Sequence, residues 1–560
     1  MVKISPATTA ILLLVLAAAI HPHPGWAQGG DAARLADIAR TAAERFASER
    51  TEDQTRPTVP ITAVGPNVEL TLDEATARAL ERNLEIAVER LNPQAQALNL
   101  ARIQASYRPT LTSLFSSRSQ VQPPTSQLNG GTIVSNDQLQ YNAGVSQALP
   151  WGGGGLQVTW NNQRQETNNA FALLNPSFNS SFNASITQPL MRGFVIDTSR
   201  QQLRVTAISR DISEVQLQAT ITTTLASVRN AYWELVYSMQ AVEVAQGSLE
   251  LAEKLLEDNR ARVEVGTLAP LDVAQSAAEV ASRRQALAQA DGTRRTAELT
   301  LKRLIVNGTE DPIWRARLAP IDTPEFRPAP LDVEAAVLRA LGERTDLVQA
   351  RRTMESNDIT LGLLRNQRLP AVDLIATYQA QGIGGTQFRR QALGGSILET
   401  IPGGYGDALR TLGGLDYPIW QVQFSVSYPI GSSAAEANYA RGRVQRNQAA
   451  SQLRALELQV AADVTDAAVQ VESGLIRYEA ALAARELSEQ RLDAEESRFE
   501  VGLSTNFFVV AAQRDLATAQ NTELRALLDY RRALVDYERV QSAPAARGGG
   551  IPTVTAGGGF

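Results

Sequence analysis

Two short stretches that lie more than two hundred residues apart have nearly the same sequence, and they constrain the fold more than any other feature of the chain. Residues Arg262–Val273 read RVEVGTLAPLDV, and residues Arg498–Val509 read RFEVGLSTNFFV. Each lies between two long segments rich in alanine and charged residues, and each holds a glycine, Gly266 or Gly502, where a helix is expected to end. We therefore expect two turns, each of which joins a pair of long helices.

The duplication extends well beyond these turns. The stretch LDEATARALERNLEIAVER from Leu72 is matched by LDVEAAVLRALGERTDLVQARR from Leu331, and SITQPL from Ser185 is matched by SVSYPI from Ser425. Each half is expected to run short helix, helix, strands, long helix, glycine turn and long helix. A repeat of this length indicates an internally duplicated module and not a solenoid of small repeats.

The first residues have the pattern of an export signal. Lys3 precedes the apolar run from Ile11 to Ile20, and cleavage at small residues fits after Ala27. The run is shorter than the roughly 20 apolar residues that a membrane-spanning helix needs. We therefore expect an exported chain in which no later segment forms a transmembrane helix.

Together, the repeats and the composition between them divide the chain into six predicted segments. In order, these are a signal peptide at 1–27, an N-terminal periplasmic segment at 28–69, a first helix–strand–helix repeat at 70–306 with strands at about 110–190, a linker at 307–329, a second repeat at 330–541 with strands at about 370–380 and 419–430, and a disordered Gly-rich tail at 542–560.

Composition argues against several classes of function. The formal net charge is -6 without a basic block, so no nucleic-acid partner is expected. Cysteine is absent, and the only histidines, His21 and His23, lie in the leader. These absences argue against disulfides, thiol chemistry, imidazole catalysis and most transition-metal sites. We expect no enzyme, no metal and no cofactor.

Parts of both repeats change from helical periodicity to an alternation of apolar and polar residues. From Trp420 to Tyr428 the apolar residues alternate with glutamine and serine, and Val372–Tyr378 forms a matching segment. A strand of a soluble sandwich can have this pattern. In an exported chain, strands near the 9 to 11 residues of a tilted membrane strand favour a transmembrane barrel with its polar face toward water.

The first repeat contains about one hairpin more than the second. The glycine run in Pro150–Gly155 lacks a following Lys-Ser/Thr, so it is interpreted as a turn and not as a phosphate-binding loop. The segments Gln122–Asp137 and Gln381–Leu415, the latter with Gly382, Gly384 and Gly385, are expected to be exposed loops. The extra hairpin either adds two strands to the sheet, which we favour, or folds as a loop.

After each set of strands comes a long segment without proline. Residues Thr198–Val265 and Ala434–Val501 each cover roughly 68 positions, which as a helix extend on the order of 100 Å. Alanine is dense along them and allows close helix packing. An ordinary coiled coil explains these helices but not the strands at their far ends. The few strands of one chain cannot close a wide barrel. Because a sheet edge with unpaired backbone groups is not tolerated in hydrocarbon, we expect several chains to complete the barrel together.

The residues from about Leu70 to Gln541 resemble the TolC-like outer membrane efflux protein family. The resemblance rests on LTLDEATARALERNLEI, on TQPLMRGF and SYPIG, and on the two Val-Gly turns, in the same order in both halves. It implies a mixed α and β membrane protein: a long antiparallel α-helical coiled-coil tunnel in the periplasm, and a transmembrane β-barrel in outer membrane lipid shared by a homotrimer. The implied function is the passive exit duct of a tripartite efflux pump or type I secretion system, with a periplasmic adaptor and an inner-membrane transporter as partners.

The resemblance also implies site residues. Carried over by position, the adaptor-docking tips are Val265, Gly266, Thr267, Val501, Gly502 and Leu503. Asp272, in the Leu-Asp-Val that follows the first turn, is a candidate for the periplasmic gate. The second turn departs from this pattern with Phe507 and Phe508, which are candidates for an apolar constriction. The alternatives are that the glycines only stop helices and that the phenylalanines pack between helices.

Two rival functions remain at the level of the sequence. One is a soluble periplasmic coiled-coil protein, such as an adaptor or a structural spacer, and the other is an adhesin-like surface protein. An adaptor has one helical hairpin with lipoyl-like β domains and lacks alternating strands with aromatic ends between its helices. Heat-modifiable, detergent-dependent extraction is expected of a barrel and not of a spacer.

Overall fold

The computed structural model describes residues 66–124, 133–169, 171–322, 330–392, 395–431 and 433–544. The chain divides into two units, Met1–Pro66 and Asn67–Phe560, and the second contains every element described below. The predicted signal peptide, nearly all of the N-terminal segment and the Gly-rich tail beyond 544 lie outside the described residues.

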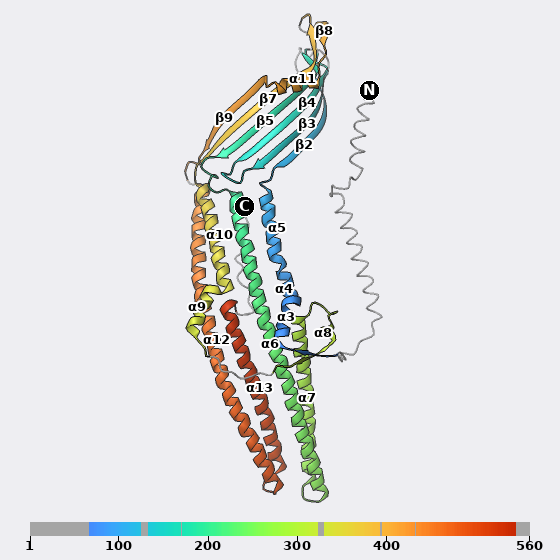
Figure 1. Ribbon diagram of the computed structural model, residues 1–560, viewed down its shortest axis with the longest axis vertical. Helices are drawn as coiled ribbons and strands as arrows, with labels where there is room; N and C mark the ends of the chain where they lie inside the picture. The colour runs from blue at the N-terminus through green and yellow to red at the C-terminus, as the bar shows by residue number, and fades with distance from the viewer. Residues whose placement is uncertain are drawn as a thin grey trace, which may run out of the picture. The chain divides into compact units, whose positions relative to one another are not determined.

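The unit Asn67–Phe560 combines long helices with one large sheet (Figure 1). After β1 (Asn67–Leu70), its first repeat consists of α3 (Leu72–Arg82), α4 (Leu84–Glu89), α5 (Leu91–Ala105), β2 (Thr110–Gln122), β3 (Val134–Ala148), β4 (Gly155–Thr167), β5 (Leu174–Pro189), α6 (Thr198–Glu264) and α7 (Pro270–Ile305). The predicted linker at 307–329 contains α8 (Pro312–Arg315) and β6 (Arg317–Pro320). The second repeat consists of α9 (Val333–Glu343), α10 (Thr345–Gln367), β7 (Ala371–Arg390), β8 (Ile397–Ile401), α11 (Tyr405–Gly413), β9 (Tyr417–Ser427), α12 (Ala434–Glu500) and α13 (Asn506–Ser542).

The large sheet has seven strands. Neighbouring strands are antiparallel in the order β2-β3-β4-β5-β7-β8, and β9 pairs with the first part of β7. The extra hairpin of the first repeat is therefore formed by strands and does not fold as a loop. Helices α5 and α10 lead into the sheet, and α6 and α12 leave it, all at the same end (Figure 1).

One prediction about this sheet is wrong. Residues Gln381–Leu415 were expected to form an exposed loop, but β7 continues to Arg390 and is followed by β8 and by the helix α11. Gly382 and Gly384 lie inside β7 and not in a loop. The cause is steric, because a Cβ atom on Gly382 would lie 2.0 Å from the carbonyl oxygen of Ala408 in α11. These glycines allow a helix to pack directly on a strand.

Capping residues define where the short and long helices begin. Thr71 and Glu74 form a capping box at the start of α3, and the Asp197 side chain accepts a hydrogen bond from the backbone N–H of Arg200 at the start of α6. The Ser433 side chain caps α12 in the same way. Each cap pairs backbone N–H groups that have no partner within the helix.

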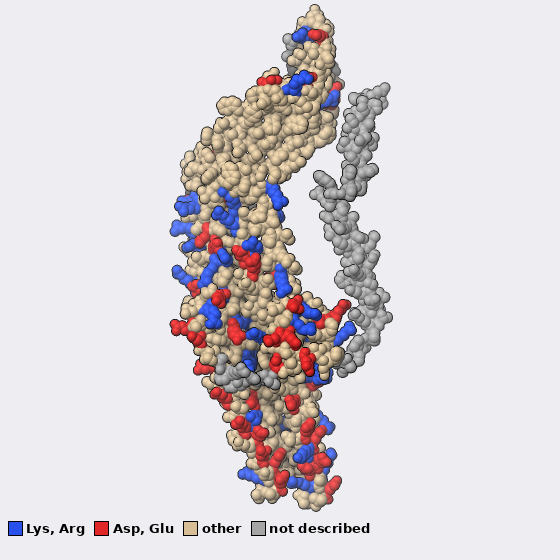
Figure 2. All heavy atoms as spheres, in the orientation of Figure 1, with Lys and Arg blue, Asp and Glu red and all other residues tan. Residues whose placement is uncertain are grey.

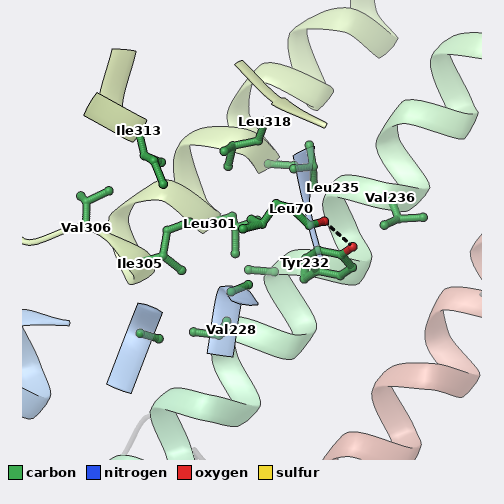
Figure 3. Packing of buried hydrophobic residues seen from close by; sticks show 14 residues of the cluster. Leu70, Val228, Tyr232, Leu235, Val236, Leu301, Ile305, Val306, Ile313 and Leu318 are labelled. Atoms are coloured by element: carbon green, nitrogen blue, oxygen red, sulfur yellow. Dashed lines mark hydrogen bonds between the residues drawn. The ribbon is translucent and has the colours of Figure 1, made fainter. Parts of the chain in front are cut away.

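The main core of the first repeat surrounds the middle of α6. Figure 3 shows Tyr232, Val228 and Leu235 of α6 packed against Leu70 of β1 and Leu301 of α7. Tyr232 is completely buried, and its hydroxyl lies 2.9 Å from the carbonyl oxygen of Leu70. Burial is the main cause that raises the pKa of Tyr232, and the hydrogen bond of its hydroxyl to Asp322 is the second. An equivalent core in the second repeat contains Val460, Val464, Val471 and Tyr530.

Candidate functional site

The two glycine turns have the same backbone geometry. Gly266 has a φ of 77° and Gly502 a φ of 79°, both in the left-handed region that favours glycine. The N–H of Thr267 donates to the carbonyl of Arg262 at 2.8 Å, and the N–H of Leu503 donates to the carbonyl of Arg498 at the same distance. This bonding satisfies the last carbonyls of α6 and α12, as in a Schellman motif.

The tips formed by these turns expose apolar side chains. Val265 is 74% exposed, Val501 is 71% exposed and Leu503 is 79% exposed. The hydroxyl of Thr267 donates to the carbonyl of Arg262 at 3.0 Å, so this polar group is held against the turn. Both tips thus offer a glycine backbone beside apolar side chains.

Just behind the tips, a buried polar group joins the two helical hairpins α6–α7 and α12–α13. The side-chain amide of Asn259 in α6 donates to the side-chain oxygen of Asn506 in α13 at 2.8 Å, and to the hydroxyl of Ser276 in α7 at the same distance. The amide of Asn506 in turn lies 3.4 Å from the carbonyl of Asp272. These four residues link three helices around one point.

An ion-paired group makes a second connection between the hairpins. The guanidinium of Arg514 in α13 donates to the carboxylate of Glu279 in α7, with its Nε 3.0 Å from Oε2, and Arg283 lies 2.7 Å from the same carboxylate. Glu279 is buried, and burial alone would raise its pKa. The hydrogen bonds and positive charges of Arg514 and Arg283 outweigh burial, so the pKa of Glu279 is lowered.

A third connection lies closest to the turns. The guanidinium of Arg262 lies 4.5 Å from the ring centroid of Phe499, and the Phe499 ring packs in a small apolar cluster with Leu255 and Val509. Arg262 and Phe499 belong to the repeated stretches around the two turns. The cation–π contact therefore joins one repeat to the other.

The gate candidates of the sequence lie in the first turns of the returning helices. Asp272 is half-buried at the start of α7. Phe507 and Phe508 are 65% and 51% exposed and contact one another edge to face, with ring centroids 5.5 Å apart. Val509, which is 1% exposed, packs between the hairpins in their place. In the single chain, neither phenylalanine is buried between helices.

Sequence reasoning missed the residues that tie the hairpins together. Asn506 lies in the repeated stretch around the second turn, but Asn259, Ser276, Glu279 and Arg514 have no motif of their own. The available signal was a polar residue at a position that the helical pattern assigns to the buried side. That signal does not identify which helix is the partner.

At the other end of the unit, the sheet has one apolar face and one polar face. Paired residues on neighbouring strands share a face. One row of paired residues runs across six strands as Leu111, Val145, Val158, Ala184, Tyr378 and Trp420. The next row, on the opposite face, runs as Thr112, Gly144, Thr159, Asn183, Gln379 and Ile419.

Charged side chains also distinguish the sheet from the helices. On the face that Figure 2 shows, the sheet is almost free of charged side chains, while Lys, Arg, Asp and Glu are scattered over the helices. Large apolar side chains on the sheet are exposed to solvent in the single chain, Trp420 by 76% and Phe424 by 64%. An exposed apolar surface of this extent indicates contact with lipid or with another protein.

The described residues contain no helix whose length and apolar character would let it span a membrane. They also contain no group of three or more His, Cys, Asp or Glu side chains that could hold a metal ion.

Comparison with known proteins identifies the fold. The pattern of the outer membrane efflux protein family matches residues 134–307 and 336–539, and a comparison with curated protein sequences gives no significant match. Solved structures of outer membrane proteins are similar to this chain. The CmeC outer membrane channel of Campylobacter jejuni has 14% identity and a TM-score of 0.60, over 84% of this chain and 85% of that chain. The outer membrane protein VceC of Vibrio cholerae has 16% identity and a TM-score of 0.59, over 84% and 96%. The MtrE outer membrane channel of Neisseria gonorrhoeae has 19% identity and a TM-score of 0.56, over 84% and 89%.

The family match takes in parts of both repeats and more than half of the chain. It includes both glycine turns, the helices α6, α7 and α12, nearly all of α13, and every strand of the large sheet except β2. The chain belongs to the outer membrane efflux protein family.

Proposed function

We propose that this outer membrane efflux protein acts as a homotrimeric channel-tunnel and forms the passive exit duct of a tripartite efflux pump or a type I secretion system. The observation that carries the proposal is a sheet with one apolar face, at whose two sides β2 and β9 each pair with a single neighbour and leave one edge free among the described residues. An open edge in hydrocarbon leaves backbone N–H and C=O groups without partners. Pairing β9 of one chain with β2 of the next, three times, pairs the free edges of both strands and closes the sheets into a barrel.

The strand count follows from this arrangement. Six strands per chain, β2, β3, β4, β5, β7 and β9, run through the sheet, whereas β8 pairs only with the last residues of β7. Three copies of six strands give a barrel of eighteen. Its polar face, which includes Gln379, Asn183 and Thr159, would line a water-filled lumen.

The same three-fold arrangement places twelve long helical segments side by side, four from each chain, as the wall of a periplasmic tunnel. Charged side chains then face water on the inside and the outside of the wall, and alanines allow the helices to approach closely. No helix needs to cross the membrane, and no catalytic group is required of a passive duct.

The tips at Val265–Thr267 and Val501–Leu503 are proposed as the docking surface for a periplasmic adaptor, which in turn contacts an inner-membrane transporter. Support comes from their matched turn geometry and from the exposed side chains of Val265, Val501 and Leu503. Apolar side chains at the end of a solvated helical hairpin suit a partner hairpin of similar shape.

The gate is proposed at the same end of the tunnel. Asp272 would narrow the entrance electrostatically, and Phe507 or Phe508 would form an apolar constriction. The exposure of both phenylalanines in the single chain leaves them free to meet their copies around a three-fold axis. The buried ties between Asn259 and Asn506 and between Glu279 and Arg514 would hold the two hairpins in register.

An adaptor or structural spacer is the less favoured alternative, because neither needs a broad sheet with one apolar face. Extraction separates the two functions. The proposed barrel requires detergent for extraction and migrates differently in gels before and after heating, since a folded barrel resists unfolding in detergent. Release by salt or sonication alone, with no heat-dependent change in mobility, would contradict the proposal and support the spacer.

A further inference from the structure

A short helix on the sheet has no counterpart in the described part of the first repeat and no role in the duct described above. Helix α11 lies at the end of the sheet that is far from the long helices (Figure 1). It packs on β7 so closely that a Cβ atom on Gly382 would lie 2.0 Å from the carbonyl oxygen of Ala408, and one on Gly384 would lie 2.5 Å from that of Gly404. The sequence of β7 is therefore adapted to hold this helix.

The face on which α11 lies follows from the strand register. Gly382 is four residues beyond Tyr378 on the same strand, so both positions face the apolar side. The hydroxyl of Tyr405 in α11 donates to the side-chain oxygen of Asn162 at 2.8 Å. Asn162 is two residues beyond Trp160, whose indole N–H donates to Ser180 on the same face. Helix α11 thus covers the apolar face and does not lie on the polar one.

The level of α11 along the strands is equally well defined. Strand β9 pairs with β7 over eleven residues, from Ser427 opposite Ala371 to Tyr417 opposite Gln381. This length equals the roughly 9 to 11 residues of a tilted strand that crosses the hydrocarbon layer. Gly382 is the first position of β7 beyond that span. The pair Tyr378 and Trp420 lies just below it, as expected of aromatic residues at a membrane interface.

The outer surface of α11 combines apolar and cationic character. Tyr405, Ala408 and Leu412 face the sheet, and Leu409 is 37% exposed beside Arg410. The side chain of Arg410 is 82% exposed. Its Nη1 lies 3.1 Å from Oδ1 of Asp407, while Oδ2 of Asp407 accepts from the N–H of Gly404 at 2.9 Å. Among the described residues, the guanidinium of Arg410 makes no other hydrogen bond.

We propose that α11 is a membrane-interface helix, seated on the outside of the barrel at the level of the outer-leaflet headgroups, with Arg410 donating to lipid phosphate groups. This inference rests on the proposed function, since it requires the sheet to span the membrane. The apolar face continues into Leu409, which reaches the acyl boundary, and a guanidinium suits the fork of oxygens on a phosphate. The phosphate belongs to a phospholipid or to a lipopolysaccharide.

Depth-dependent quenching tests the location. The chain has no cysteine, so single thiols at three positions carry one fluorophore each. Leu409→Cys samples α11, Phe424→Cys the apolar face of β9, and Gln423→Cys its polar face. The protein is reconstituted in vesicles whose lipids carry a nitroxide at the headgroup or in the middle of the acyl chain. We expect headgroup nitroxide to quench Leu409→Cys most, acyl nitroxide to quench Phe424→Cys most, and neither to quench Gln423→Cys.

Two other results are informative. If Phe424→Cys is quenched and Leu409→Cys is not, the inference is wrong, because α11 then packs against a neighbouring subunit or lies in water. If none of the three positions is quenched, the membrane-spanning sheet itself is wrong, and the proposed function fails with it.

Thermal unfolding in a phosphate-free detergent tests the role of Arg410. Added phosphatidylglycerol or lipid A is expected to raise the midpoint of the wild type, and a phosphate-free diglucosyl lipid is not. Arg410→Ala should lose most of this rise, and Arg410→Lys should keep part of it. Arg118→Ala, which removes a cation from the opposite face of the sheet, should keep all of it. A response to only one of the two phosphate lipids assigns the source, and an equal rise in Arg410→Ala and wild type would overturn the assignment.

Discussion

Asn259 and Asn506 are joined side chain to side chain at 2.8 Å in the interior of the tunnel wall, one from the end of α6 and the other from the start of α13. Both are essentially inaccessible to water, with exposures of 0% and 1%. Since a buried amide without a partner is costly, this bond favours one arrangement of the two hairpins over others. It lies directly behind both tips, where movement of one hairpin past the other would open or close the tunnel.

We predict that Asn506→Ala loosens the tunnel end. The substitution leaves the amide of Asn259 and the hydroxyl of Ser276 with fewer hydrogen-bond partners. This loss destabilises the closed arrangement by about 1–3 kcal/mol. Because each 1.4 kcal/mol is about tenfold in an equilibrium constant, the population of open channels should rise by about an order of magnitude. Planar-bilayer recording measures this as a higher mean current at fixed voltage.

Asn521→Ala is the matched control for that experiment. Asn521 lies further along α13, and its side-chain amide donates to the carbonyl of Ala517 within the same helix at 2.8 Å. Its removal should leave the current unchanged. Equal effects of the two substitutions would show that the bond between the hairpins has no special role.

The Glu279–Arg514 pair predicts a specific dependence on pH. The pKa of Glu279 is lowered in the folded protein, so the pair stabilises the fold above the unfolded pKa of about 4.3. This contribution is lost only as the pH falls through the lowered folded value. The thermal midpoint should therefore show no contribution from Glu279 titration between pH 7 and pH 5.

Arg514→Ala should change that profile. Burial then acts on Glu279 with only Arg283 to oppose it, so the pKa rises and stability is lost at a higher pH than in the wild type. Arg284→Ala, which breaks the exposed pair with Glu253, should cost only about 0–1 kcal/mol and leave the profile unchanged. Superimposable pH profiles for Arg514→Ala and wild type would refute the assignment.

A turn glycine and a helix glycine predict stability changes of opposite sign. Gly502→Ala places an L-residue at a φ of 79°, which costs roughly 1–2 kcal/mol. Gly247→Ala, in the middle of α6 with no atom within 4 Å of the new Cβ, should gain about 1 kcal/mol from helix propensity. Thermal unfolding followed by the helical circular dichroism signal should show the first midpoint lowered and the second raised. Midpoints that move in the same direction would contradict this account of the turns.

The proposed constriction predicts an effect on conductance. Asp272→Ala should reduce cation preference at the entrance, and Phe508→Ala should widen an apolar restriction and raise the single-channel current. Val509 is the wrong position for such a test, because it packs inside the apolar cluster with Leu255 and Phe499. Unchanged selectivity and current in both variants would remove Asp272 and Phe508 from the gate.

Much of the fold could be predicted because its signals are local. The two long segments without proline predict helices, and the structure has α6 at Thr198–Glu264 and α12 at Ala434–Glu500. The alternation around Trp420 predicts a strand with one apolar face, and β9 has this pattern at Tyr417–Ser427. In both cases the signal lies within one continuous stretch of the chain: the absence of proline for the helices and the alternation of apolar and polar residues for the strand.

The remaining features depend on contacts between distant segments. The glycines of Gln381–Leu415 suggested a loop because glycine usually marks a turn. In β7 they instead make room for the backbone of α11, a relationship that no local window contains. The bond between Asn259 and Asn506 is equally invisible, since the partner of a buried amide is decided by how the two hairpins meet.

The central claim, that three copies share one barrel and one tunnel, is tested most directly by imaging single particles of the detergent-extracted protein. We expect a hollow, threefold-symmetric particle with a detergent belt at one end, and a belt diameter that corresponds to eighteen strands. Monomeric particles, or particles without a belt, would contradict the claim and favour a periplasmic adaptor or structural spacer instead.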